Sequence, residues 1–379
     1  MKYLFNLVLL SLLTSCLKSE FFSNVFSQLN KDKKGMNLII SPLSIYQVLS
    51  LLANGAEGET LSEMVKILGS NDIIELNNIN EKILEESKKF STLYIANAIM
   101  TKCYPPNLFL SYAKLYSADI EILENVEQVN NWCSEKTHGK INKIIERLDP
   151  QTVMILLNVI YFKGKWVYHF KKDSNMKLPF YNFGKEEKVV ETMIQTETFR
   201  YYENSEVQII ELPFKDDFMS AIIILPSEKI NINQYIETIS SKKNYLNELI
   251  NKLDYAKVQI ELPKFEIDFS QELNNVIKEL GMEKIFDCGK ADLSGLCQDQ
   301  KNLYVSSILH KTYLKVNEVG TEAAAITAII VLKTAMMNKD KEIIYEMKVN
   351  RPFIFLLKNS RFPEGYNFVF MAKIEKIED

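Results

Sequence analysis

The sequence predicts an α+β protein built as one large domain. Helical patterns with capping residues dominate the chain up to Trp166, and alternating or continuously apolar strand patterns dominate after it. With 379 residues, 47% of them hydrophobic, the chain can bury a large core. Length alone would suggest two or three domains. Because no Pro/Gly/Ser-rich linker divides the chain, we expect one.

The first elements are predicted to be helix, strand, helix and helix. One helical face carries the apolar residues Phe21, Phe22, Val25, Phe26 and Leu29. A strand is predicted over Leu38–Ile40, followed by a helix that Ser41 caps and Asn54 ends. Thr60 and Glu63 predict a capping box at the start of the next helix.

The middle of the chain alternates between strands and helices. We expect a strand over 92–101, a helix over 108–116 and an amphipathic helix over 129–145. The stretch Val153–Phe162 is almost wholly apolar, as in a strand buried on both faces. Its one amide, Asn158, should hydrogen-bond to specific partners because a buried unpaired amide costs a few kcal/mol.

The remaining elements are predicted from periodicity and turn residues. They are strands over 199–202, 207–213 and 220–226, a helix over 234–252, a strand over 258–265, a helix over 268–280, a strand over 305–311, and closing strands over 353–357 and 368–371.

The stretch from Glu318 to Asp340 carries two structural signals. Gly320 and three alanines suit a mobile turn, and the β-branched residues that follow suit the interior of a sheet. As a strand, it would present these residues on one face: Thr321, Ala323, Ala325, Thr327, Ile329 and Val331. The alternative is a helix, which Glu-Ala-Ala-Ala also favours.

Composition argues against several functions. The net charge of −4 comes from interspersed acids and bases, which disfavours nucleic acid as a partner. Three histidines and twelve glycines form no known catalytic or phosphate-binding motif, so we predict neither an enzyme nor a metal or other cofactor. Five cysteines make no disulfide framework; Cys288 and Cys297 are near enough to pair, but we expect free thiols.

Residues 1–16 are predicted to be a signal peptide. Lys2 precedes the apolar run Leu4–Leu13, which is too short to span a bilayer, and small residues follow. The mature protein would then be secreted. The alternative is that this segment prolongs the first helix of a cytoplasmic protein. The four residues ending at Cys16 also match a bacterial lipoprotein signal weakly.

Several motifs occur together in the order typical of one family. They are Ser41-Pro42-Leu43-Ser44, Asn158-x-x-Tyr-Phe-Lys-Gly-x-Trp166, Leu262-Pro263-Lys264-Phe265, Glu318-x-Gly-Thr-Glu-Ala-Ala-Ala with Thr327, and Asn350-Arg351-Pro352-Phe353. The sequence resembles the serpins, protease inhibitors that trap their target by inserting a cleaved loop into a sheet. The matching motifs extend over nearly the whole chain.

The resemblance implies an architecture. A serpin has a large, mostly antiparallel main sheet, two further sheets, about eight or nine helices and an exposed reactive-centre loop. Here the serpin domain would span 17–379, with the loop at about 318–350.

The resemblance also implies roles for individual residues. The hinge would comprise Gly320, Thr321, Glu322, Ala323, Ala324, Ala325, Ile326 and Thr327. The breach, where the loop first enters the sheet, would comprise Trp166, Lys264 and Glu318, with Lys264 paired to Glu318. The shutter, a hydrogen-bonded spot where the sheet parts, would comprise Ser41, Ser44, Asn158 and His310.

The function implied is suicide-substrate inhibition of a serine protease, by a monomer that forms a covalent complex and has no membrane contact in its mature form. The usual register places the cleaved bond at Thr334-Ala335; Lys333, Met336 and Met337 are alternatives because the loop is longer than usual. Alternative functions are a non-inhibitory carrier or chaperone, or inhibition of a cysteine protease. The hinge residues that would share one face, Thr321, Ala323, Ala325 and Thr327, include none of the proline, charged or bulky residues often found in non-inhibitory members.

Overall fold

The computed structural model describes residues 20–89, 92–215, 218–242, 244–297, 302–321 and 343–378. A first helix spans residues 20–32. The further helices are α2 (Pro42–Ala53), α3 (Gly58–Ile67), α4 (Ile73–Ser87), α5 (Asn107–Leu115), α6 (Val126–Lys136), α7 (Ile232–Ser241), α8 (Tyr245–Asn251) and α9 (Asn274–Glu279), with short 3-10 turns η1 (Lys172–Ser174) and η2 (Lys284–Phe286). The strands are β1 (Leu38–Ile40), β2 (Leu93–Thr101), β3 (Asp119–Ile122), β4 (Met154–Phe162), β5 (Met176–Asn182), β6 (Glu186–Glu203), β7 (Val207–Pro213), β8 (Met219–Pro226), β9 (Asp254–Pro263), β10 (Phe265–Glu272), β11 (Ser307–Val316), β12 (Ile344–Lys348), β13 (Phe353–Asn359) and β14 (Phe368–Ile374).

One sheet has five strands, in the order β10-β11-β4-β2-β3. The pairs β10-β11 and β2-β4 are antiparallel, whereas the pairs β4-β11 and β2-β3 are parallel. The parallel pair β4-β11 joins segments about 150 residues apart in sequence. We call the line along which β4 and β11 pair the seam of the sheet.

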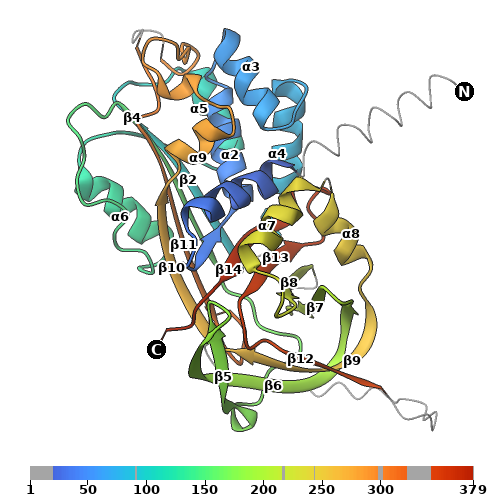
Figure 1. Cartoon of the computed structure of the whole chain (residues 1–379). Helices are drawn as coiled ribbons and strands as arrows, with labels where there is room; N and C mark the ends of the chain where they lie inside the picture. The colour runs from blue at the N-terminus through green and yellow to red at the C-terminus, as the bar shows by residue number, and fades with distance from the viewer. Residues whose placement is uncertain are drawn as a thin grey trace, which may run out of the picture.

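The other nine strands form one sheet instead of the two further sheets that the resemblance implies. Eight of them follow the order β1-β14-β13-β8-β7-β6-β9-β12, and β5 pairs with β6 beside this path. The link is β6, an 18-residue strand that pairs with β5, β9 and β7 in turn along its length. Figure 1 shows β5, β6, β9 and β12 at one end of the molecule, and α3 and α5 at the other.

The five-stranded sheet separates two apolar clusters. Alternate residues of β4, such as Leu156 and Ile160, belong to the main core, whereas Leu157 and Val159 belong to a smaller cluster beneath α6. Helix α2 lies on the main-core side, and every one of its residues is buried. Figure 1 shows α6 against the sheet, away from α2. Both faces of β4 are therefore covered, which explains its continuous apolar run.

The helix predicted over 129–145 is shorter than expected. It ends at Lys136, and His138 and Gly139 then take positive φ angles of 52° and 76°. A left-handed pair ends a helix. Ile141 is still buried in the small cluster, because the chain folds back beside the helix. The helical period beyond Lys136 was thus a wrong prediction.

Two predicted helices in the second half are also wrong in part. The helix over 234–252 is divided into α7 and α8 at Asn244, whose φ is 56°. In the helix predicted over 268–280, residues 268–272 belong to strand β10, and the helix is confined to α9. Phe265, Ile267 and Phe269 alternate as buried residues in β10, so the period of two prevails there.

The capping box at Thr60 is absent. Helix α3 begins at Gly58, and the Thr60 hydroxyl accepts a 3.0 Å hydrogen bond from the Asp292 backbone N–H instead. Glu63 accepts hydrogen bonds from the backbone N–H groups of Glu283 and Lys284. Both side chains tie α3 to the distant segment around η2. Within the described residues, no helix combines the length and apolar character needed to cross a bilayer.

Candidate functional site

The chain turns back on itself directly after the seam strand β11. Val316 pairs with Thr321 in an antiparallel bridge, and Gly320 pairs likewise with Lys165, just beyond the end of β4. The Thr321 backbone N–H donates to Gly164 O at 2.8 Å, and the Gly164 N–H donates to the Thr321 hydroxyl at 2.7 Å. Thr321 is fully buried. The first two residues of the predicted hinge, Gly320 and Thr321, therefore already lie between the ends of β4 and β11.

Gly320 is required by this turn. Its φ of 150° is one that side-chain-bearing residues rarely adopt, and a Cβ atom there would lie 2.0 Å from Gly164 O. A side chain would have to push the returning chain away from Gly164. The glycine thus permits close approach of the predicted hinge to the segment just after β4.

Trp166 fixes the position of the turn. Its ring is 1% exposed and stacks on Phe214 with centroids 4.2 Å apart. The indole Nε1–H donates to Asn317 O at 3.0 Å, and the backbone N–H donates to Val319 O at 2.9 Å. The tryptophan therefore holds the segment from which the loop departs.

Lys264 forms a paired charge site at the same end of the sheet. Its Nζ lies 2.6 Å from Glu318 Oε1 and 2.8 Å from Glu191 Oε1. Burial lowers the pKa of Lys264, but hydrogen bonds with both carboxylates outweigh it and the pKa is raised. Burial acts to raise the pKa of Glu318, yet the hydrogen bond from Lys264 leaves it lowered. The three predicted breach residues thus meet around one turn.

The predicted shutter residues meet at the middle of the seam, where Asn158 and His310 are directly opposite each other. The Ser44 hydroxyl donates to Asn158 Oδ1 at 2.7 Å, and the His310 Nδ1–H donates to the same oxygen. The Ser41 backbone N–H donates to His310 Nε2 at 3.1 Å. These contacts join β4, β11 and the start of α2.

Asn97 completes this network, and our sequence analysis did not identify it. Asn158 Nδ2–H donates to Asn97 Oδ1, from the neighbouring strand β2. Asn97 is a lone amide among the apolar residues of β2, which is the same signal that marked Asn158. A search for buried amides on both strands would have found it.

His310 is neutral because both ring nitrogens are engaged in a fully buried site. Nε2 accepts a hydrogen bond, so the proton is on Nδ1. Burial lowers the pKa of His310 to about 3.

Folding stability is therefore expected to fall as the pH drops below about 6.5, the pKa of an unperturbed histidine. Between about 3 and 6.5 the unfolded chain binds a proton at His310 that the folded protein does not. Between pH 7 and pH 5 this group should remove about 2 kcal/mol of unfolding free energy. Urea unfolding of wild type and His310→Gln at both pH values measures the difference. His138→Gln, at an exposed histidine, is the control, and its unfolding free energy should change with pH as that of the wild type does. A His310→Gln variant whose unfolding free energy has the same pH dependence as that of the wild type would contradict the role assigned to His310.

The rest of the predicted site lies outside the described residues. This holds for the hinge residues Glu322, Ala323, Ala324, Ala325, Ile326 and Thr327, and for the bond candidates Lys333, Thr334, Ala335, Met336 and Met337. Residues 1–16 are also outside.

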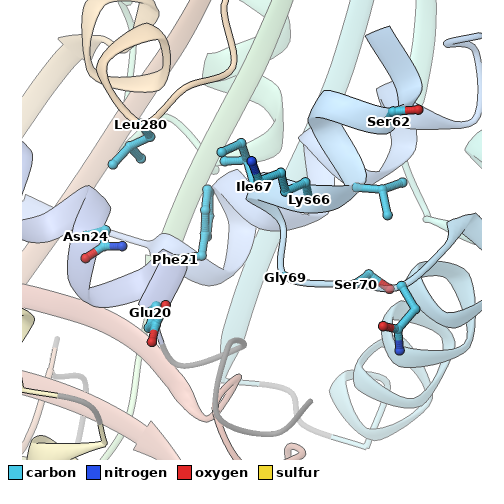
Figure 2. A pocket seen from close by; sticks show the side chains of 11 residues that line it. Glu20, Phe21, Asn24, Ser62, Lys66, Ile67, Gly69, Ser70 and Leu280 are labelled. Atoms are coloured by element: carbon cyan, nitrogen blue, oxygen red, sulfur yellow. The ribbon is translucent and has the colours of Figure 1, made fainter. Parts of the chain in front are cut away.

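A hollow of about 620 Å³ beside the first helix is separate from the seam. Figure 2 shows Phe21, Ile67 and Leu280 in its wall, with Glu20 and Lys66 near its edge. None of its lining residues belongs to β4 or β11, so parting of these strands would not reshape it directly.

Comparisons with known proteins agree with this geometry. The family description "Serpin (serine protease inhibitor)" matches residues 17–375. Leukocyte elastase inhibitor of Xenopus laevis is 32% identical over 364 residues, covering 90% of this chain and 94% of that protein. Serpin B11 of Homo sapiens is 31% identical, with the same shares covered. The crystal structure of native tengpin, a thermophilic serpin, matches with a TM-score of 0.85 at 30% identity, covering 96% of this chain and 94% of tengpin. The predicted fold and resemblance are confirmed, and the chain belongs to the serpin family.

Proposed function

We propose that this serpin inhibits serine proteases as a suicide substrate, with residues 318–350 as the reactive-centre loop that the protease cleaves. The observation that carries the proposal is the parallel pairing of β4 with β11, together with Thr321 already paired to Val316 at the end of β11. A chain that turns back after β11 runs antiparallel to both β11 and β4. One further strand therefore fits between them with hydrogen bonds on both edges.

The pairing of Val316 with Thr321 sets the register of that strand. Continued along β11, it brings Ala323, Ala325 and Thr327 opposite Leu314, Thr312 and His310. Those three β11 residues are buried on the main-core side. Side chains that are opposite each other share a face of the sheet, so the small hinge residues would enter the core without displacing bulk.

On the other face of the inserted strand, a carboxylate would lie beside positively charged side chains. The same register brings Glu322 beside Lys315 on β11. Tyr161 of β4 is opposite Tyr313, so Lys163, two residues further on, is close to Lys315 on the other strand. The Glu322 carboxylate would lie between two lysines. Hinge residues of both faces thus meet compatible neighbours.

The chemistry begins in the protease. Its serine oxygen bonds to the carbonyl carbon of the cleaved residue, the peptide C–N bond breaks, and the leaving nitrogen takes a proton. Water would normally hydrolyse the acyl-enzyme. If the freed segment inserts first, it carries the attached protease with it and distorts the active site. Inhibition is therefore a race between insertion and hydrolysis.

We assign the cleaved bond to Thr334-Ala335, with Lys333, Met336 and Met337 as alternatives. Thr334 suits an elastase-like pocket, Lys333 a trypsin-like one and the methionines a chymotrypsin-like one. One relative bears the name leukocyte elastase inhibitor, which supports the first choice. Mass spectrometry of the released C-terminal fragment identifies the bond.

A small panel of elastase-like, trypsin-like and chymotrypsin-like proteases tests the function. At least one should give a complex that survives SDS, at the combined mass of the protease and the N-terminal fragment of the cleaved serpin. Cleavage by all three without any such complex would contradict serine-protease inhibition and favour the non-inhibitory alternative. A stable complex with a cysteine protease alone would favour the cross-class alternative.

We further propose that the inhibitor is a monomeric single domain over 17–379, secreted after loss of residues 1–16. The serpin match begins at residue 17, directly after the predicted signal peptide, which supports a separate role for that segment. A cytoplasmic protein would retain it. N-terminal sequencing of the natural protein distinguishes the two locations.

A further inference from the structure

A polar hollow of about 550 Å³ lies on the α6 side of the five-stranded sheet. We call it the tyrosine-lysine pocket. It is lined by Tyr94, Tyr161 and Tyr313, and by Lys140, Lys163 and Lys315. We propose that the tyrosine-lysine pocket binds a small aromatic anion, of the aryl phosphate or aryl sulfate class, and that this ligand opposes loop insertion. The second half of the proposal rests on the proposed function.

The three tyrosines form a row across three neighbouring strands. Tyr94 of β2 is opposite Tyr161 of β4, which is opposite Tyr313 of β11. Tyr94 and Tyr161 stack with centroids 5.6 Å apart, and Tyr161 and Tyr313 lie 6.5 Å apart. His138 contacts Tyr94 edge-on at 5.5 Å. Such a row offers rings against which a planar aromatic group can pack.

The charges around the rings are mainly positive. Lys140, Lys163 and Lys315 line the pocket, and among the described residues Glu266 is a carboxylate that pairs with one of them, Lys315. Glu266 lies 2.7 Å from Lys315 Nζ and accepts a 2.8 Å hydrogen bond from the Tyr313 hydroxyl. Asp268 on the same strand pairs with Lys311, which is outside the pocket. Among the described residues, Lys163 forms no ion pair with a carboxylate, so the pocket favours an anionic group beside the tyrosine rings.

The pocket extends across the seam. Tyr161 and Lys163 belong to the β4 side, whereas Tyr313 and Lys315 belong to the β11 side. Insertion of a strand would move these two pairs apart by about 4.8 Å. In the proposed register it would also bring the Glu322 carboxylate between the lysines. The pocket exists in this form only before insertion.

The ligand should therefore bind the intact protein better than the cleaved, inserted one. By thermodynamic linkage, a ligand that prefers the intact form disfavours insertion to the same extent. Asn317 also lines the pocket, and its side-chain Oδ1 accepts from the Val319 N–H at 3.0 Å. The ligand would thus contact the turn from which the loop departs.

Phenyl phosphate is a suitable probe, measured by calorimetry on the intact protein and on the loop-cleaved protein. Inorganic phosphate supplies the charge without the ring, and phenol supplies the ring without the charge. We expect phenyl phosphate to bind intact protein about fivefold or more tighter than inorganic phosphate, because the ring adds packing. We expect affinity for the cleaved form to be lower by about tenfold.

Lys163→Gln should weaken phenyl phosphate binding by about fivefold. The matched control is Lys177→Gln, at an exposed lysine of β5, and it should bind like wild type. Binding no tighter than that of inorganic phosphate, or unaffected by Lys163→Gln, would overturn the site. Equal affinity for both forms would overturn the coupling to insertion. Failure of the proposed function appears separately, as a cleaved form that gains no thermal stability in the absence of phenyl phosphate.

Discussion

Cleavage within the loop should raise the midpoint of thermal unfolding by on the order of 10 °C or more. The inserted strand would fill the β4-β11 seam and place Ile329 and Val331 on the main-core face, in register with Ile308 and the residue before β11. Burial of these two side chains is worth roughly 3 to 6 kcal/mol. Hydrogen bonds gained along both edges largely offset the ordering of the backbone.

Differential scanning calorimetry before and after limited proteolysis measures this shift. The protease should cut within residues 322–342, and mass spectrometry should verify a single cut. A nicked protein that unfolds at the temperature of the intact protein would show that no strand is added.

Thr321→Arg should convert the inhibitor into a substrate. Thr321 is fully buried, and its hydroxyl is 2.7 Å from the Gly164 N–H. The arginine would displace the turn that Thr321 forms with Gly164 in the intact protein. Insertion would then require the arginine to be buried without a partner, at a cost of several kcal/mol. The loop would still be cut, but hydrolysis would precede insertion, and the yield of SDS-stable complex should fall by more than about tenfold.

Thr321→Ser is the matched control because it retains the hydroxyl and the small volume. It should form complexes nearly as well as wild type. Nicked Thr321→Arg should also lack the thermal gain of the nicked wild type, which links the two experiments through one residue. Undiminished complex formation by Thr321→Arg would contradict the proposed path of insertion.

The charged and polar contacts of the site could be predicted from the sequence where a motif, or a polar residue within an apolar strand, marked them. Asn158 is conspicuous in an apolar strand, and Ser44 and His310 donate to its oxygen in the structure. Lys264 and Glu318, predicted to pair, lie 2.6 Å apart.

Other features depend on which strands are neighbours, and one sequence does not contain that information. The row formed by Tyr94, Tyr161 and Tyr313 exists only because β2, β4 and β11 are adjacent in a specific register. Strand β10 was taken for helix because its polar residues and the later Gly281 fit a helix with a C-cap. Pairing with β11 decides in favour of the strand.

The distance in sequence between β4 and β11 also has a consequence for biosynthesis. When β4 leaves the ribosome, roughly 150 further residues must be translated before its neighbour exists, which takes on the order of ten seconds. During that time one edge of an almost wholly apolar segment has no native partner. The nascent chain is therefore most vulnerable to aggregation late in translation, and the last third of the polypeptide ends that exposure.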